Sequence, residues 1–323
     1  MTAALTGWVK SALLEIQEYT RLAIATAKGS LSRPFYIHDF VEQLDRIGIG
    51  SLTVVVLTGF FTGAVLALQS GFTLDQFGAR PAVGRLVSAT MIKELGAVLT
   101  ALMLTGRVSS GIAAELGAMA VTDQINALRA LGTDPVRKLV VPRVLAGIIM
   151  TPILTVVANT VGLVGAWIVA TQKLQIASSL YWTSVVDGLY MEDVWMGLLK
   201  PFFLGFIVVT VGCHVGLRTR GGTEGVGRST TNAVVAASVG VIAIDFFSTQ
   251  LLLAVLFCWL QCRPASVDRR PGGPATRRSS SSRACGWRST TRSCSTTSAS
   301  GCTRATRRSS SAPAARASRR CSS

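Results

Sequence analysis

The sequence predicts an all-α integral membrane protein, with an N-terminal interfacial helix, five transmembrane helices and a disordered C-terminal tail. Its 323 residues are 49% hydrophobic and only 15% charged, with a mean hydropathy of +0.47. This composition is too apolar for a soluble domain of this length. Five stretches also approach the ~20 mostly apolar residues that a helix needs to cross a bilayer.

The formal net charge of +16 is concentrated in the tail. Residues 1–261 hold 18 Lys and Arg against 15 Asp and Glu, whereas residues 262–323 hold 14 Arg against Asp268 alone. A protein that reads nucleic acid needs its positive charge on a folded surface. The composition therefore excludes a nucleic-acid-binding fold for the main body. Five of the seven cysteines also lie in 262–323, which excludes a disulfide scaffold.

Residues 1–46 form the first predicted region, an interfacial amphipathic helix followed by a linker. One helical face carries Leu5, Trp8, Val9, Ala12, Leu13, Ile16 and Tyr19, and the other carries Lys10, Glu15, Glu18 and Arg21. Such a helix is typical of a segment that lies on the membrane surface. A cleavable signal peptide is the less favoured alternative, because acidic residues interrupt the apolar stretch.

Residues 47–261 form the second region, a five-helix domain. The apolar stretches are 48–68, 86–104, 144–170, 196–217 and 233–260. We expect the second helix to continue past Arg107 toward Met119. Ser109, Ala113 and Gly117 then make a stripe of small residues that lets another helix backbone approach closely.

The distribution of Lys and Arg predicts a cytoplasmic N-terminus. With that orientation the inner segments hold Lys10, Arg21, Lys28, Arg33, Arg46, Arg129, Arg137, Lys138, Arg143, Arg218, Arg220 and Arg228. The outer segments hold Arg80, Arg85, Lys173 and Lys200. An odd number of spans then places the end of the fifth helix outside.

Lys200 lies near one end of the fourth stretch, and three further charged residues lie within the predicted spans: Lys93, Glu94 and Asp245. Ionisable groups in hydrocarbon mark a functional site or a paired structural contact, because isolation there is costly. Lys93 and Glu94 point ~100° apart on a helix, so they either bond neighbouring helices or line a polar cavity for a lipid headgroup. Asp245 is expected to be a structural acid, hydrogen-bonded within the bundle.

A short cytoplasmic helix is predicted at about 119–131. Val121, Ile125 and Leu128 share one face, Asp123, Asn126 and Arg129 another, and Gly132 ends the helix. The Asp134-Pro135 pair is expected to cap the next helix. This element either docks a soluble partner or lies flat on the bilayer.

No enzymatic or metal site is expected in this chain. Residues 222–229 fit the phosphate-loop spacing with Arg228 in place of lysine, but they lie between two spans, where a nucleotide fold has no room. A flexible turn is preferred there, with Thr230, Thr231 or Asn232 capping the fifth helix. His38, His214 and the scattered cysteines have no metal-ligand spacing.

Several ordered motifs resemble the MlaE family of ABC-transporter permeases, the membrane subunits of maintenance-of-lipid-asymmetry and mammalian-cell-entry lipid transport systems. They are Lys-Glu-Leu-Gly at 93–96, the run at 106–119, Val-Thr-Asp-Gln-Ile-Asn-Ala-Leu at 121–128, Asp-Pro at 134–135, Leu-Val-Val-Pro-Arg at 139–143, the run at 222–235 and Asp-Phe-Phe at 245–247. The resemblance covers roughly residues 5–260.

The resemblance implies a homodimeric permease in a bacterial inner membrane. A separate cytoplasmic ATPase would bind ATP and Mg and take 119–131 as its coupling helix, so that this chain holds no cofactor. A periplasmic mammalian-cell-entry protein would exchange phospholipid with it. Lys93 and Glu94 match the family's charged pair near the lipid cavity. An ion-coupled secondary carrier and a non-transporting scaffold remain the alternatives.

Residues 262–323 form the third region, an Arg/Ser-rich tail. After Gln261 the sequence abruptly loses the large apolar side chains that a core requires. One interpretation is a basic arm that binds anionic lipid or RNA. The preferred interpretation is a frame error or read-through of GC-rich DNA, which yields this residue set.

Overall fold

The computed structural model describes residues 2–30 and 37–262 of the chain, and the elements within them are helical. The α-helices are α1 (Thr2–Ser30), α2 (Ile37–Asp75), α3 (Val83–Thr90), α4 (Gly96–Leu104), α5 (Ser110–Val121), α6 (Gln124–Ala130), α7 (Val141–Gln172), α8 (Ser178–Asp187), α9 (Met191–Leu217) and α10 (Gly222–Cys262). Four short segments join them: the 3₁₀ turn η1 (Arg80–Ala82) and the π-helical η2 (Met91–Leu95), η3 (Thr105–Ser109) and η4 (Val136–Val140). The predicted tail lies outside the described residues from 263 onward.

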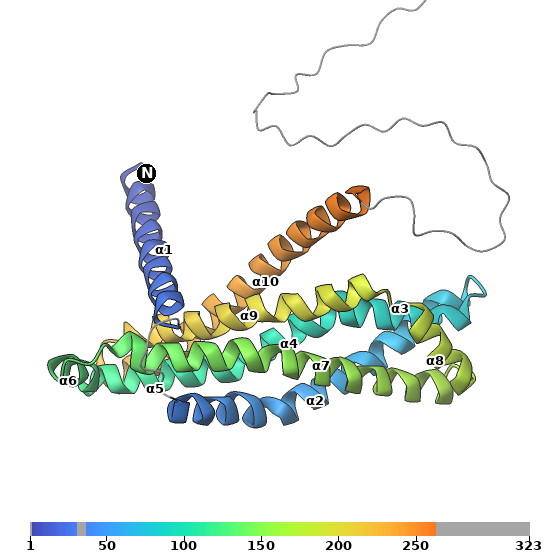
Figure 1. Ribbon diagram of the computed structural model, residues 1–323, viewed down its shortest axis with the longest axis horizontal. Coiled ribbons are helices and arrows are strands. Elements are labelled where there is room, and N and C mark those ends of the chain that lie inside the picture. The colour runs from blue at the N-terminus through green and yellow to red at the C-terminus, as the bar shows by residue number, and fades with distance from the viewer. Residues whose placement is uncertain (1, 31–36, 263–323) are drawn as a thin grey trace, which may run out of the picture. The chain divides into compact units, whose positions relative to one another are not determined.

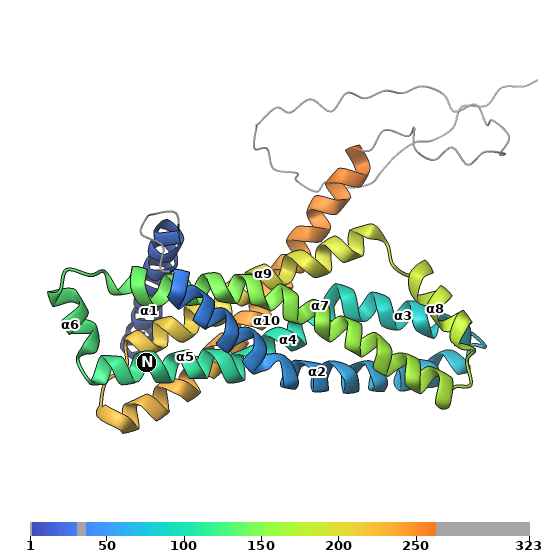
Figure 2. The same ribbon diagram turned by 60° about the horizontal axis from the view of Figure 1, so that its bottom comes forward.

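Five helical runs are long and apolar enough to cross a membrane, which confirms the predicted number of spans. They are Ile37–Asp75, Arg80–Val121, Val136–Gln172, Asp193–Leu217 and Gly222–Leu252. The runs pack side by side, with α2 along α7 and with α9 against α5, α7 and α10, and the later part of α10 leaves the bundle at an angle (Figures 1 and 2). The connection through α6 closes one end of the bundle, and α8 lies at the other.

The α2–α7 contact depends on glycines that bring the two backbones together. A Cβ added to Gly63 would lie 1.9 Å from the carbonyl oxygen of Gly162, and one added to Gly59 would lie 2.8 Å from that of Ala158. Close backbone contact of this kind replaces the hydrophobic driving force that is missing between helices in lipid.

The predicted small-residue stripe on the second span is confirmed as a helix contact. Ser109 and Ala113 face Gly212 and Gly216 of α9, whose added Cβ atoms would lie within 2.9–3.1 Å of them. Gly117 faces Thr219 in the same way, at 2.9 Å. The stripe therefore seats α5 directly on α9.

The second span is not one regular helix, as the sequence analysis assumed. The π-helical segments η2 and η3 interrupt it at Met91–Leu95 and Thr105–Ser109. Each widens the turn and re-aims the side chains within it, a feature that is frequent at functional sites. Lys93 and Glu94 lie in the first segment and Arg107 lies in the second.

The short helix α8 was not anticipated from the sequence. It packs against α3, and its Tyr181 is fully buried and donates a hydrogen bond to the carbonyl oxygen of Leu163 at 3.2 Å. Burial raises the pKa of the Tyr181 hydroxyl to about 12. This tyrosine fixes the connection between the third and fourth spans.

The helix predicted over 119–131 is interrupted, and the prediction was wrong about Val121. The α5 helix runs on to Val121, the chain turns at Asp123 with φ 57°, and α6 begins only at Gln124. Val121 therefore does not share a helical face with Ile125. The Asp134 cap is confirmed, because its carboxylate accepts a hydrogen bond from the Val136 N–H at 3.0 Å.

The flexible turn predicted over 222–229 was also wrong, because α10 already begins at Gly222. The connection before α10 covers residues 218–221, and Gly221 and Gly222 have positive φ angles of 96° and 69°. Thr230 and Thr231 lie inside the helix and donate to carbonyl oxygens three residues earlier, so they do not cap it. Beyond its first turn, a helix bonds its amides to its own carbonyl oxygens, so residues 222–229 do not form a loop that wraps around a phosphate.

The N-terminal helix extends over Thr2–Ser30 and contacts α9. The Tyr19 and Thr210 hydroxyls are hydrogen-bonded at 2.8 Å, the Tyr19 ring meets His214 edge to face, and Glu18 pairs with Arg218 at 3.0 Å. The side chains of Leu5, Trp8, Val9 and Ala12 lie outside the described residues. The position of this helix at a membrane surface stays a prediction.

Candidate functional site

Lys93 and Glu94 both pair with α9, which is the first of the two alternatives that the sequence left open. The Lys93 Nζ lies 2.9 Å from Asp193 Oδ1, and Glu94 Oε2 lies 2.5 Å from Lys200 Nζ. Lys93 and Glu94 point in different directions from η2. Lys93 therefore meets the acid Asp193, and Glu94 meets the base Lys200, seven residues further along α9.

Lys200 is the centre of the site and was missed as a functional residue. Lys200 was expected to be a charge of an outer segment, whereas its side chain is completely buried. Its Nζ lies 2.5 Å from Glu94, 2.7 Å from the Thr249 hydroxyl and 3.5 Å from Asp245. The sequence offered one signal for a role of Lys200, which is its position inside an otherwise apolar run.

Asp245 contributes the acid from α10. It pairs with Lys200, but its Oδ1 has no hydrogen-bond partner among the described residues, and neither has Oδ2 of Asp193. Asp245 was predicted to be hydrogen-bonded within the bundle, whereas the contact of its carboxylate in the structure is the ion pair with Lys200. Lys93, Glu94, Asp193, Lys200 and Asp245 together form what we name the ion-pair cluster, which joins η2, α9 and α10.

The ion-pair cluster has three acidic and two basic side chains, which leaves one formal negative charge in excess. Some of these side chains are buried and others are partly exposed. The side chains of Lys93 and Glu94 are each 41% exposed, whereas Lys200 is fully buried and Asp193 nearly so. Buried pairs are costly to break because the remaining charge is left without compensation. The exposed members can exchange a partner for a charged headgroup while Lys200 keeps Asp245 and Thr249.

A cavity of about 180 Å³ lies beside the ion-pair cluster, between α7 and α9. Its lining residues are Ile92, Val156, Asn159, Thr160, Leu163, Val194, Gly197 and Leu198. Ile92 precedes Lys93, and Val194 follows Asp193. A mostly apolar cavity next to ion pairs is suited to an amphiphilic ligand.

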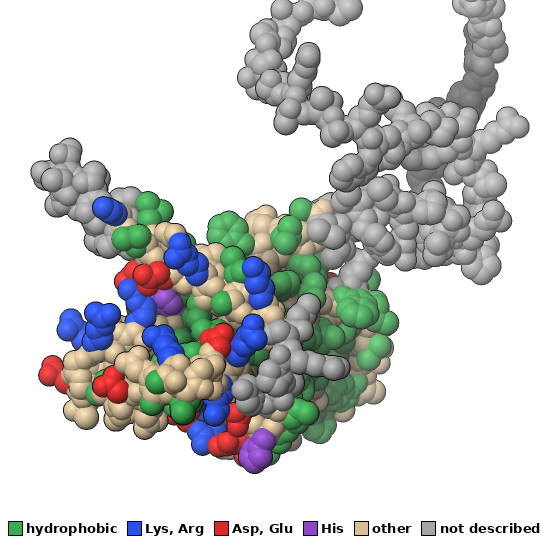
Figure 3. Space-filling model, turned by 60° about the vertical axis from the view of Figure 1, so that its left-hand side comes forward, with side chains coloured by type: hydrophobic (Ala, Val, Ile, Leu, Met, Phe, Trp, Pro, Cys, Tyr) green, Lys and Arg blue, Asp and Glu red, His purple; other side chains and the backbone are tan. Residues whose placement is uncertain are grey.

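The helix α6 is placed at the charged end of the bundle, where acidic and basic side chains gather (Figure 3). Ile125 is 6% exposed and packs against its own chain, so it is not available to a partner. Leu131 is 78% exposed and Arg129 is also exposed. The Asn126 side chain donates to Asp123 at 2.8 Å. The predicted apolar face of Val121, Ile125 and Leu128 is thereby replaced by a surface around Arg129 and Leu131.

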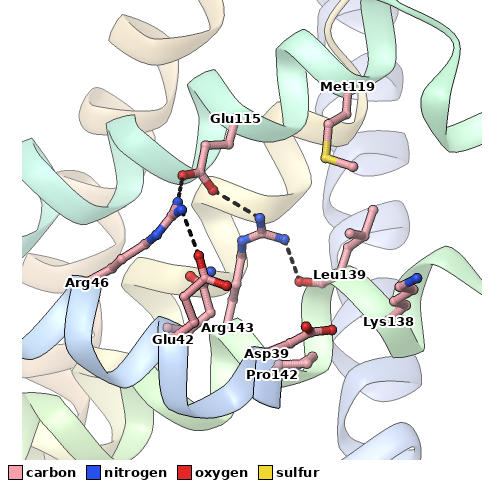
Figure 4. A pocket seen from close by; sticks show the side chains of 10 residues that line it. Asp39, Glu42, Arg46, Glu115, Met119, Lys138, Leu139, Pro142 and Arg143 are labelled. Atoms are coloured by element: carbon pink, nitrogen blue, oxygen red, sulfur yellow. Dashed lines mark hydrogen bonds and ion pairs between the residues drawn. The ribbon is translucent and has the colours of Figure 1, made fainter. Parts of the chain in front are cut away.

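A second group of charges lines a cavity of about 460 Å³ at the same end, and Figure 4 shows its side chains. Arg46 of α2 bonds Glu115 of α5 and also Glu42, at 2.8 Å. Arg143 donates to Glu115 at 3.0 Å and to the carbonyl oxygen of Leu139 at 2.8 Å. Glu115 and Arg143 belong to the family motifs quoted above, but no role was predicted for Glu115, and Arg143 was predicted only as an inner charge.

Within residues 2–30 and 37–262, no group of three or more His, Cys, Asp and Glu side chains could hold a metal ion. A five-span helical bundle with ion pairs inside its spans is compatible with the membrane subunit of a transporter. The sequence over residues 40–251 matches the family described as Permease MlaE. The chain belongs to this family of ABC-transporter permeases, as its motifs indicated.

Curated relatives agree with this assignment. A probable ABC transporter permease protein of Rickettsia felis is 39% identical over 240 residues, which are 74% of this chain and 93% of the relative. The intermembrane phospholipid transport system permease protein MlaE of Haemophilus influenzae is 32% identical over 66% of this chain and 82% of its own length. The chloroplastic protein TRIGALACTOSYLDIACYLGLYCEROL 1 of Arabidopsis thaliana is 34% identical over 64% and 59%.

Proposed function

We propose that this permease forms the path of a phospholipid transporter and is driven by a separate ATPase. The observation that carries the proposal is the ion-pair cluster. Lys93 and Glu94 are half-exposed at a π-helical break, and they pair with the buried Asp193 and with the fully buried Lys200. A charged headgroup could compete for Lys93 and Glu94 without removing every partner of Lys200. The phospholipid transport named for the Haemophilus relative supports this choice of substrate.

The partners follow from the same proposal. A cytoplasmic ATPase binds ATP and Mg and docks on α6, and the permease itself holds neither. A second copy of the chain completes the membrane unit, and a periplasmic mammalian-cell-entry protein exchanges lipid with it. We place the complex in a bacterial inner membrane with the α6 end in the cytoplasm. Membership in an ABC-permease family favours this reading over an ion-coupled carrier or a scaffold.

The test is ATP-driven transfer of a fluorescent phospholipid by the assembled transporter in vesicles, with Glu94→Gln as the variant. We expect transfer to fall about tenfold or more, equivalent to ~1.4 kcal/mol of barrier, because the headgroup loses its charged counterpart. Lys200 keeps Asp245 and Thr249, so the variant remains folded.

The matched control is Glu224→Gln, the same change at an exposed acid in the first turn of α10. It is expected to transfer lipid at the normal rate. If Glu94→Gln loses thermal stability in proportion to transfer, Glu94 is a structural residue. Undiminished transfer would contradict a role of the ion-pair cluster in the lipid path.

A further inference from the structure

Three cavities lie in a row between α2 and the second span, and we name this row the groove. The first is the 460 Å³ cavity of Figure 4. The second, of about 130 Å³, is lined by Gln43, Arg46, Ile47, Arg107, Val108, Gly111, Ile112 and Glu115. The third, of about 270 Å³, is lined by Leu57, Thr58, Phe61, Thr62, Leu99 and Met103. From the first cavity to the third, the residue numbers of the lining residues rise on α2 and fall on the second span. The two helical runs are therefore antiparallel neighbours.

Arg107 is the cation of the second cavity that has no partner among the described residues. Its exposed side chain makes no hydrogen bond or ion pair within residues 2–30 and 37–262, although a Cβ added to Gly50 would lie 3.1 Å from its guanidinium. Arg46 and Arg143, by contrast, are both engaged by Glu115. An uncompensated guanidinium beside apolar surface is costly in a membrane, and an anionic ligand would remove that cost.

Glycines before and after Arg107 in the sequence leave open space, and Gly111 lines the second cavity. A Cβ added to Gly106 or to Gly111 would meet no other atom within 4 Å. Val108 and Ile112 are buried beneath this space. The second cavity therefore offers a free cation above an apolar floor, with room for a group as large as a phosphate.

The groove changes from charged to apolar along its length. Leu99 lies eight residues before Arg107, about 12 Å along a helix with a rise of 1.5 Å per residue. Leu57 and Phe61 face it from α2, and both are more than half exposed. A charged end, one arginine without an ion pair and an apolar cavity farther along the same two helical runs match an amphiphile with a phosphate and an acyl chain.

We propose that this groove binds one phospholipid, with its phosphate on Arg107 and an acyl chain over Leu57, Phe61 and Met103. The lipid enters sideways from the leaflet at the α6 end of the bundle. The proposal rests on the proposed function, because it assigns that transporter a lateral lipid site separate from the ion-pair cluster.

The experiment measures binding of dihexanoylphosphatidylglycerol to the purified full-length chain in detergent by calorimetry. Dihexanoylglycerol and inorganic phosphate are the comparison ligands, so that the lipid and the bare anion are distinguished. We expect only the phospholipid to bind with measurable affinity. Equal binding of dihexanoylglycerol, or of phosphate alone, would overturn the proposal.

The variants are Arg107→Gln, which removes the cation, and Gly111→Leu, which fills the open space. Each is expected to weaken binding about tenfold, whereas Arg107→Lys keeps most of the affinity. The controls are Arg228→Gln and Gly227→Leu on α10. Gly227 is matched because its added Cβ also meets nothing within 4 Å, and both controls should bind like the unmodified chain.

Two results would assign the groove differently. Unchanged binding by Gly111→Leu would show that the lipid sits elsewhere. A cross-link between two copies through Gly111→Cys, formed with loss of lipid, would identify the groove as an interface between copies. Because binding is measured without ATP or partners, the groove can fail this test while ATP-driven transfer, the test of the proposed function, succeeds.

Discussion

At the residue scale, the decisive position is Lys200. Its ammonium group is buried inside α9 and is shared by Glu94, Asp245 and the Thr249 hydroxyl, which come from two other segments. A lysine in such a place is stable only with its acids. Lys200 therefore fixes the relative positions of η2, α9 and α10, and the half-exposed Lys93 and Glu94 are presented from that fixed base.

Replacing Lys200 with methionine is expected to destabilise the chain by about 3–5 kcal/mol, the typical cost of breaking a buried pair. The lower end applies because Glu94 is 41% exposed and can regain water. Thermal unfolding in detergent measures the effect. Lys173→Met, at an exposed lysine, is the control and is expected to change stability by less than ~0.5 kcal/mol. Equal stability of the two variants would contradict the pairing of Lys200.

At the element scale, the segment around α6 is shaped by its turns. Asp123 with positive φ separates α6 from α5, and Gly132 with φ 74° ends it. Between these turns Ile125 faces the chain's own core, while Arg129 and Leu131 face outward. A partner that docks here therefore meets a cation and one large apolar side chain rather than the apolar stripe that the sequence suggested.

Arg129→Glu is expected to abolish capture of the ATPase subunit in a pull-down, because reversal places like charge against any acidic rim on the partner. An exposed charge adds little to fold stability, so the variant should remain monodisperse in detergent. Arg228→Glu, at an exposed arginine of the same end, is the control and should bind normally. Retained capture by Arg129→Glu would mean that α6 merely lies on the membrane.

At the scale of the whole molecule, the two ends of the bundle differ in charge. The α6 end holds the arginines and lysines of η4, of the turn before α10 and of α10 itself, whereas the α8 end holds Arg80, Arg85 and Lys173. Lys200 no longer counts among the outer charges, because it is buried. The asymmetry expected of a multi-pass membrane protein is thus stronger in the structure than in the sequence count.

Labelling of single cysteines tests this orientation. In a background with the native cysteines replaced by serine, we expect Lys173→Cys to react with a membrane-impermeant maleimide in intact cells. Leu131→Cys, beside α6, should react only after permeabilisation, because the basic end stays in the cytoplasm. Both positions are exposed. The reverse pattern would invert the proposed topology.

The sequence by itself determined the five spans, the contact stripe of Ser109, Ala113 and Gly117, and the family. These depend on local physics. A membrane helix satisfies its backbone hydrogen bonds within one segment, and small residues at a four-residue spacing share one helical face. The ordered family motifs can be recognised in the sequence without knowledge of the fold. The same local rules foresaw the Asp134 cap, because it joins residues only two apart.

Only the tertiary structure decided which charges meet. Glu94 and Lys200 are 106 positions apart, and their contact depends on the rotation and register of separate helices, which no local pattern fixes. The π-helical breaks, the inward turn of Ile125 and the isolation of Arg107 arise in the same way. Each is set by what the neighbouring helices leave room for, since packing in a membrane is decided by the fit between helix surfaces.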